Sequence, residues 1–138
     1  MKKTTDLLNE LKNSNNIDNY LKDNEKIIIN NSISEHLCKI FEERSLSKTE
    51  IIRKSDINEI YAYQILSGKR IPSRDKTICL CIGANFTVED TNKTLKIGGY
   101  APLYPKSQRD SIIIYGIHNN YTIWQINEDL FNHGLNTF

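Results

Sequence analysis

An internal repeat is the feature that most limits the folds open to this chain. Residues 74–103, laid over residues 109–138 at an offset of 35, match at nine of thirty positions, whereas chance gives roughly two or three. The identical pairs are Arg74/Arg109, Asp75/Asp110, Ile78/Ile113, Ile82/Ile117, Asn85/Asn120, Thr87/Thr122, Asn92/Asn127, Leu95/Leu130 and Gly99/Gly134. Each copy reads as an apolar helix, a short turn, a second helix capped by Thr and a closing Gly. The repeat therefore predicts two helical hairpins that stack to bury their apolar faces.

The second copy holds more apolar residues than a two-helix appendage needs for itself. They are Ile112, Ile113, Tyr115, Ile117, Ile123, Trp124, Ile126, Leu130 and Phe131. The link before this copy contains Pro102 and Pro105, so the link cannot be helical throughout. We expect some of these apolar residues to cover the first hairpin, and others are available for a dimer contact.

Ahead of the repeat, capping patterns mark the starts of further helices. Ser32-x-x-Glu35 and Ser47-x-x-Glu50 both fit a capping box, and Asn58 is a good N-cap. With the apolar spacing behind these caps, the chain predicts helices over residues 34–44, 48–54, 58–67, 74–84 and 87–97. The predicted fold class is all-α.

The positive charge of the chain gathers in one stretch. The net charge of the whole is only +1, which argues against a highly basic nucleic-acid coat protein. Residues 48–76, however, hold seven Lys or Arg against four Asp or Glu, a net of +3. This stretch covers two short helices joined by a brief turn and followed by the basic loop 69–73, an arrangement typical of a helix-turn-helix that binds DNA.

The same stretch resembles the lambda repressor-like (Xre family) helix-turn-helix regulators. The matching segments are Leu46-Ser47-Lys48-Thr49-Glu50-Ile51-Ile52, Asp56-Ile57-Asn58 and Ile65-Leu66-Ser67-Gly68-Lys69-Arg70-x-Pro72-Ser73. The chain departs from the family at Ile52, where Ala is preferred, and at Asp56, where Gly is preferred. Asp56 still suits a turn, because Asp tolerates a left-handed backbone. The resemblance implies a five-helix core over about residues 33–99, followed here by the second stacked hairpin.

The resemblance also implies which residues touch DNA. Side chains that read bases would be Glu59, Ile60, Tyr63 and Gln64, from the first two turns of helix 58–67. Side chains that bind phosphate would be Lys48, Asn58, Lys69, Arg70 and Arg74. The function expected is a sequence-specific regulator of transcription that binds double-stranded DNA through the major groove, as a homodimer.

Three regions follow from these patterns. Residues 1–31 form an N-terminal extension with short helices around Leu7 and Ile17, residues 32–99 the helix-turn-helix domain, and residues 100–138 the C-terminal hairpin. The main alternative function is a protein-binding adaptor, antitoxin or inhibitor that uses the C-terminal hairpins, because a fold does not fix a function.

Other classes find little support. Cys79 and Cys81 lie two apart in a predicted helix and diverge by about 200°, so they cannot share a metal ion. We therefore expect structural cysteines and no metal or cofactor. The chain shows no catalytic motif, so an enzyme is not expected. No apolar run approaches a membrane span, and the N-terminus lacks the apolar core of a signal peptide, so the expected location is the cytoplasm.

Overall fold

The computed structural model describes residues 3–23 and 32–138, and every regular element in these ranges is an α-helix. The all-α class predicted from the sequence is therefore confirmed. Contacts divide the chain into two compact units, Met1–Asn30 and Asn31–Phe138.

Within residues 3–23 the first unit contains two short helices, α1 (Thr4–Asn13) and α2 (Ile17–Asp23). Asn16 starts α2, because its side-chain Oδ1 accepts a hydrogen bond from the Asp18 amide at 2.8 Å. Neither helix contains a buried residue. Four of the apolar side chains described in this unit, Leu8, Leu11, Ile17 and Leu21, are 40–56% exposed.

The second unit contains seven helices within residues 32–138. They are α3 (Ser32–Glu43), α4 (Lys48–Ser55), α5 (Glu59–Leu66), α6 (Arg74–Gly83), α7 (Val88–Ile97), α8 (Gln108–His118) and α9 (Ile123–Asn132). The five predicted ranges agree with α3 to α7 within two residues at each end. Ser32 is the first residue of α3, and its side chain lies outside the described residues, so the capping box predicted there stays a prediction.

Side-chain caps explain why these helices begin where they do. Ser47, Ser73, Thr87 and Thr122 each accept a hydrogen bond from the backbone amide three residues later. At Thr87 and Thr122 the bond is reciprocated by Asp90 and Gln125, which completes two capping boxes. These contacts are local in sequence, so a short stretch of chain is enough to set each boundary.

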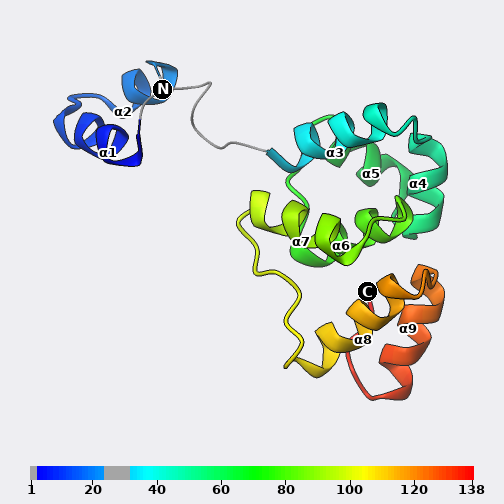
Figure 1. The fold of residues 1–138 in the computed structure, drawn as a ribbon. Coiled ribbons are helices and arrows are strands. Elements are labelled where there is room, and N and C mark those ends of the chain that lie inside the picture. The colour runs from blue at the N-terminus through cyan, green and yellow to red at the C-terminus, as the bar shows by residue number, and fades with distance from the viewer. Residues whose placement is uncertain (1–2, 24–31) are drawn as a thin grey trace. The chain divides into compact units, whose positions relative to one another are not determined.

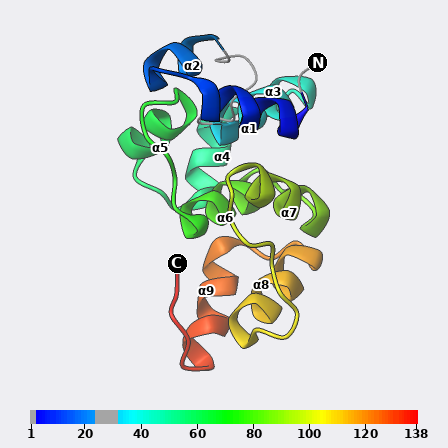
Figure 2. The same ribbon diagram turned by 90° about the vertical axis from the view of Figure 1, so that its left-hand side faces the viewer.

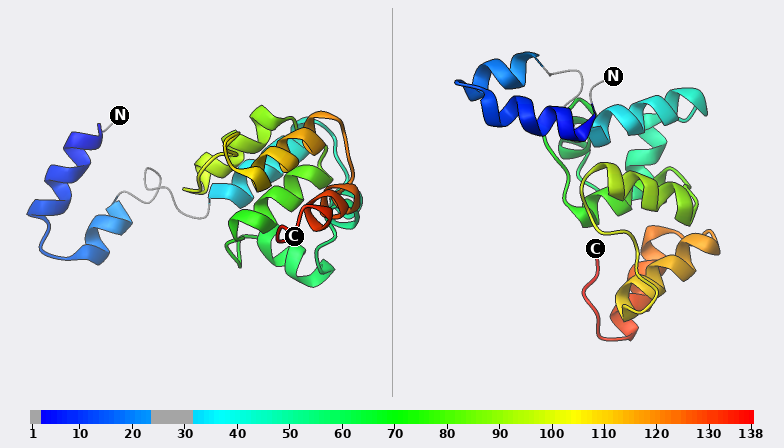
Figure 3. Two further views of the ribbon diagram at one scale, coloured as in Figure 1. Left: turned by 90° about the horizontal axis from the view of Figure 1, so that it is seen from below. Right: turned by 60° about the vertical axis from the view of Figure 1, so that its left-hand side comes forward.

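The helices of the second unit form three layers (Figures 1 and 2). The α6–α7 hairpin is the middle layer, with α3 to α5 on one side and α8–α9 on the other, as the right-hand view of Figure 3 also shows. One apolar core joins α3, α4 and α5 to α6 and includes the buried residues Leu37, Phe41, Ile65 and Leu80. A second core lies between the two hairpins and includes Ile78, Leu95, Ile113 and Leu130.

The two hairpins share their local backbone geometry at the repeat offset of 35. Asn85 and Asn120 turn each chain between its helices in the left-handed conformation, at φ 59° and 58°. Such a conformation is uncommon outside glycine, and Asn is one of the residues that tolerate it. Gly99 and Gly134 close the copies at φ 77° and 71°.

Ion pairs between the hairpins are reciprocal. Arg74 of the first copy donates to Asp110 of the second, with Nη2 and Oδ2 2.9 Å apart. Arg109 of the second copy donates in turn to Asp75 of the first, with Nη1 and Oδ1 3.0 Å apart. When residue i of one copy contacts residue j of the other and the reverse contact is also made, the two copies are related by an approximate two-fold rotation and not by a translation. The two hairpins therefore face each other as near-equivalent halves.

Candidate nucleic-acid interface

A three-residue connection, 56–58, joins α4 to α5. Asp56 ends α4 in the left-handed conformation, at φ 55°. Asn58 then starts α5, because its Oδ1 accepts a hydrogen bond from the Tyr61 amide at 3.1 Å. Two short helices are thus held at a fixed angle by one strained residue and one cap.

The two sides of α5 differ sharply. Ala62, Ile65 and Leu66 are at most 5% exposed and belong to the core. On the other side Ile60 is 71% exposed and Tyr63 is 40% exposed. The inner side anchors the helix, while the outer side offers side chains that the fold does not use for packing.

The four predicted base-reading residues all lie on α5. Glu59, Ile60 and Tyr63 are exposed, whereas Gln64 is half-buried. Gln64 is also engaged by its own chain, because Nε of Arg70 donates to Oε1 of Gln64 at 2.7 Å. The guanidinium of Arg70 lies 5.8 Å from the ring centre of Tyr61. A predicted base-reading residue and a predicted phosphate-binding residue thus form one hydrogen-bonded pair.

Three of the other predicted phosphate-binding residues are exposed around α5. Lys48 opens α4, Asn58 precedes α5, and Lys69 follows it in the loop. The Oδ1 of Asn58 serves the cap, so its amide NH₂ group is the part that could donate to a ligand. Ile71, in the same loop as Lys69, is 67% exposed and was not singled out from the sequence.

Arg74 has different surroundings from those predicted for a phosphate-binding residue. Its guanidinium donates to the carbonyl oxygens of Ala101 and Pro102 and to both carboxylate oxygens of Asp110. Its side chain is only 25% exposed. Arg74 therefore joins the two hairpins, and its role in the structure is to hold them together. The sequence could not indicate this, because the partner carboxylate lies 36 residues away.

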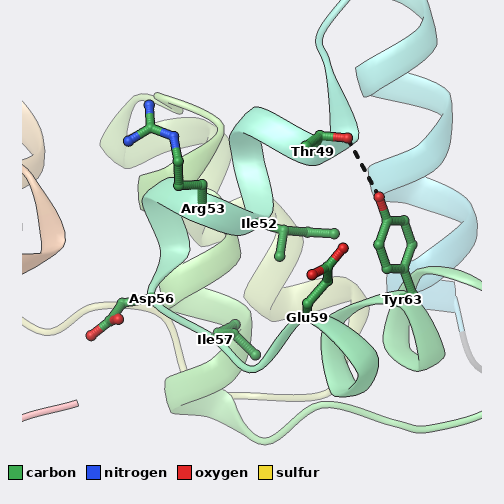
Figure 4. A pocket seen from close by; sticks show the side chains of 7 residues that line it. All are labelled: Thr49, Ile52, Arg53, Asp56, Ile57, Glu59 and Tyr63. Carbon is green, nitrogen blue, oxygen red and sulfur yellow. Dashed lines mark hydrogen bonds between the residues drawn. The ribbon is translucent and has the colours of Figure 1, made fainter.

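A hollow of about 260 Å³ lies between α4 and α5 (Figure 4). Its lining residues are Thr49, Ile52, Arg53, Asp56, Ile57, Glu59 and Tyr63. The Thr49 Oγ1 and Tyr63 Oη atoms are 3.5 Å apart across its mouth. Sequence reasoning gave Thr49 no role, and the only signal for it is a hydroxyl beside Lys48 in the first turn of α4.

Arg53, at the edge of this hollow, is paired on its own helix. Its Nη2 donates to Glu50 Oε2 at 2.8 Å. This hydrogen bond holds the pKa of the Glu50 carboxyl below its usual value and raises the pKa of Arg53. Both groups are therefore charged at neutral pH, and their charges offset each other. Lys48, Lys69 and Arg70 are the predicted phosphate-binding cations that lie around α5.

Metal chemistry and membrane insertion find no site in the described ranges. Residues 3–23 and 32–138 contain no group of three His, Cys, Asp or Glu side chains that could hold a metal ion. Burial raises the pKa of the Cys79 and Cys81 thiols to about 12, so both stay protonated and unreactive. None of the described helices is long and apolar enough to cross a membrane.

Comparison with protein-family models, with curated proteins and with solved structures found no match. A function is therefore inferred from the α4–α5 region itself, which combines an anchored helix, an exposed outer side and flanking cations.

Proposed function

We propose that this chain is a sequence-specific transcriptional regulator that reads the major groove of double-stranded DNA with α5. The observation that carries the proposal is the two-sided character of α5. Its inner side is fixed in the core, while Ile60 is 71% exposed and Glu59 and Tyr63 are exposed at the edge of the α4–α5 hollow. An α-helix fits the major groove, where each base pair presents a distinct pattern of donors, acceptors and methyl groups.

The chemistry of the outward residues suits base edges. Gln64 can pair with adenine through its amide, Glu59 can accept from the cytosine amino group, and Ile60 can contact a thymine methyl group. Arg70 holds the Gln64 oxygen at 2.7 Å and so favours one orientation of that amide. A preset orientation lowers the entropy lost on binding.

The flanking cations suit the phosphate backbone. Lys48 lies before α5, and Lys69 and Arg70 lie after it, so contacts on both sides of the groove would fix the register of the helix. Asn58 adds a neutral amide donor at the start of α5. Chain-wide charge is nearly balanced, so these few residues are expected to supply most of the salt dependence.

Fluorescence-anisotropy titration across a salt series tests the proposal. The duplexes would come from the region upstream of the gene for this chain, with a scrambled duplex of equal length as control. We expect at least roughly 10³-fold preference for one duplex and affinity that falls steeply with salt. Equal binding to both duplexes would remove the sequence-specific part, and no binding to either at low salt would contradict the proposal as a whole.

A protein-binding adaptor is the second candidate function. The observation in its favour is that Tyr115, Trp124 and Phe131 of the C-terminal hairpin are 47–75% exposed. Large exposed aromatic side chains are more typical of contacts with protein than with a phosphate backbone. Under this alternative, substitutions on α5 would leave the activity of the chain in its cell unchanged.

A further inference from the structure

The α8–α9 hairpin carries a partly exposed aromatic face. We define this aromatic face by four residues, the exposed Tyr115 and Trp124 and the half-buried Ile114 and Tyr121. Tyr115 is 60% exposed and Trp124 is 47% exposed. The rings of Tyr115 and Tyr121 meet edge to face, with centres 5.9 Å apart. Tyr121 and Trp124 in turn line one wall of a hollow of about 350 Å³, which makes the face continuous.

The aromatic face is free of formal charge. Residues 111–127 include no Asp, Glu, Lys or Arg, although these types make up 25% of the chain. Charged residues border the face, with Arg53 and Lys54 on the far wall of the 350 Å³ hollow and Asp129 close enough to Tyr121 to interact with it electrostatically. An aromatic, uncharged centre with a charged rim is the composition of a protein–protein interface.

The repeat shows what this side of a hairpin does elsewhere in the fold. Leu80, Cys79 and Phe86 of the first hairpin occupy the positions of Tyr115, Ile114 and Tyr121 in the second. All three are at most 3% exposed, because they belong to the core shared with α3, α4 and α5. The first hairpin thus uses this side to bind helices. The same side of the second hairpin is covered only in part within the second unit, because Ile114 and Tyr121 are half-buried against the second core while Tyr115 is 60% exposed.

The cover of the second hairpin cannot be an exact counterpart of α4. In the first hairpin α4 approaches α6 at Gly83, where an added Cβ would overlap the Ile51 carbonyl oxygen. The position equivalent to Gly83 is His118, whose side chain keeps a helix backbone farther away. Contact on this face therefore has to be made through side chains, which large aromatic residues such as Tyr115 can provide.

We infer that the aromatic face binds the aromatic face of a second copy of this chain. In a two-fold dimer the residues next to the axis lie close to their own copies, so a charge there meets the same charge. A face without formal charge avoids this repulsion. A nucleic acid would instead require Lys or Arg at the centre of the face. An acidic protein partner would also require cationic side chains there.

Sedimentation equilibrium of the full chain without DNA is the first test. The wild type should be a dimer at micromolar concentrations. Tyr115→Glu should raise the dimer dissociation constant at least tenfold, because it puts one charge from each copy into an interface that otherwise holds none. Tyr104→Glu is the matched control, since Tyr104 is 55% exposed but lies in the link before α8, outside the aromatic face. Circular dichroism would establish that both variants are folded.

Disulfide trapping is a second test that does not depend on a disruptive substitution. In a Cys38→Ser background, Tyr115→Cys should form a disulfide-linked dimer on mild oxidation, and Tyr104→Cys should not. The two remaining cysteines, Cys79 and Cys81, are buried and do not interfere.

Three outcomes would overturn the inference. They are a wild-type monomer at about 100 μM, well above the dissociation constants of specific dimers, an unchanged mass for Tyr115→Glu, and equal trapping at positions 104 and 115. If the mass were unchanged but Tyr115→Glu abolished DNA binding, the face would belong to the DNA surface instead. Because the dimer is measured without DNA, failure of the proposed DNA binding would be recorded separately.

Discussion

Gln64 and Arg70 meet because the chain folds back at the end of α5. Gly68 takes a positive φ of 87°, and the amides of Lys69 and Arg70 both donate to the Gln64 carbonyl oxygen, at 2.9 and 3.2 Å. The loop is therefore wrapped around the last turn of the helix. This brings the Arg70 guanidinium to the Gln64 side chain and makes the two residues act as a pair.

Replacing Gln64 tests whether α5 reads bases. We expect Gln64→Ala to cost about 1–3 kcal/mol of binding free energy, mainly at one base position of the target. The measurement is anisotropy against a set of duplexes that differ at single positions. Equal losses on specific and scrambled duplexes would mean that Gln64 does not contribute to specificity.

Replacing Arg70 tests the phosphate contact. We expect Arg70→Ala to weaken binding to all duplexes and to lower the slope of log affinity against log salt by about 1. Arg74→Ala is the comparison, because Arg74 donates to Asp110 and two carbonyl groups inside the fold. That variant should lower the free energy of unfolding and leave the salt slope near the wild-type value. If Arg74→Ala lowered the slope of log affinity against log salt, Arg74 would have to contact DNA phosphate as first predicted.

At the scale of the element, helix starts were predictable and helix neighbours were not. Each helix cap depends on a hydrogen bond between residues only three apart, so a short stretch of sequence is enough to predict it. The capping residues are Ser47, Asn58, Ser73 and Thr87. The role of Arg74 depends instead on a carboxylate 36 residues away. The apolar pattern indicated that the second hairpin covers the first, but it could not indicate which side of α8 stays exposed.

Gly83 gives a prediction about how α4 and α6 pack. A Cβ at this position would overlap both Ser55 Oγ and the Ile51 carbonyl oxygen, and Ser55 Oγ already donates to that oxygen at 2.6 Å. We expect Gly83→Ala to lower the free energy of unfolding by about 1–3 kcal/mol, because the two helices must separate. Urea denaturation would measure this, with Lys96→Ala on the exposed side of α7 as control. Unchanged stability would mean that α4 can move away at little cost.

At the scale of the whole molecule, the reciprocal ion pairs can be compared directly. Asp110 has a side chain that is 10% exposed and also accepts from the Tyr104 amide at 2.9 Å, whereas the Asp75 side chain is 43% exposed. We expect Asp110→Asn to cost about 1–3 kcal/mol of unfolding free energy and Asp75→Asn less than about 1 kcal/mol. Urea denaturation of the two variants checks the order, and equal costs would contradict the role given to burial.

Acid should weaken the contact between α3 and α7. Arg44, which follows α3, donates to both oxygens of Asp90 on α7, at 3.1 and 3.2 Å. This contact holds the pKa of Asp90 below its usual value of 3.8. Its contribution to stability is therefore present above pH 3.8 and is lost as the pH falls through the lower pKa of the folded state.

Arg44→Gln checks this pH dependence. The urea midpoints of wild type and variant should differ at pH 7 and converge as the pH falls below the lowered pKa of Asp90, where that carboxyl is protonated in both. The difference should be under about 1 kcal/mol, because the Arg44 side chain is 45% exposed. A difference that persists in acid would show that Arg44 acts through the Phe86 ring, whose centre lies 5.2 Å away.

The link between the hairpins, residues 98–107, lowers the binding free energy that their interface needs in order to keep them together. Joined by a short tether, the two halves meet at an effective concentration of about a millimolar or more. An association of about 7 kcal/mol, too weak to hold two separate chains together at submicromolar concentrations, is then enough to keep the tethered halves closed about 99% of the time. Because the tether holds the two halves together, the outer surface of each half can differ from that of the other. The α6–α7 half packs against α3 to α5, whereas the α8–α9 half exposes Tyr115 and Trp124.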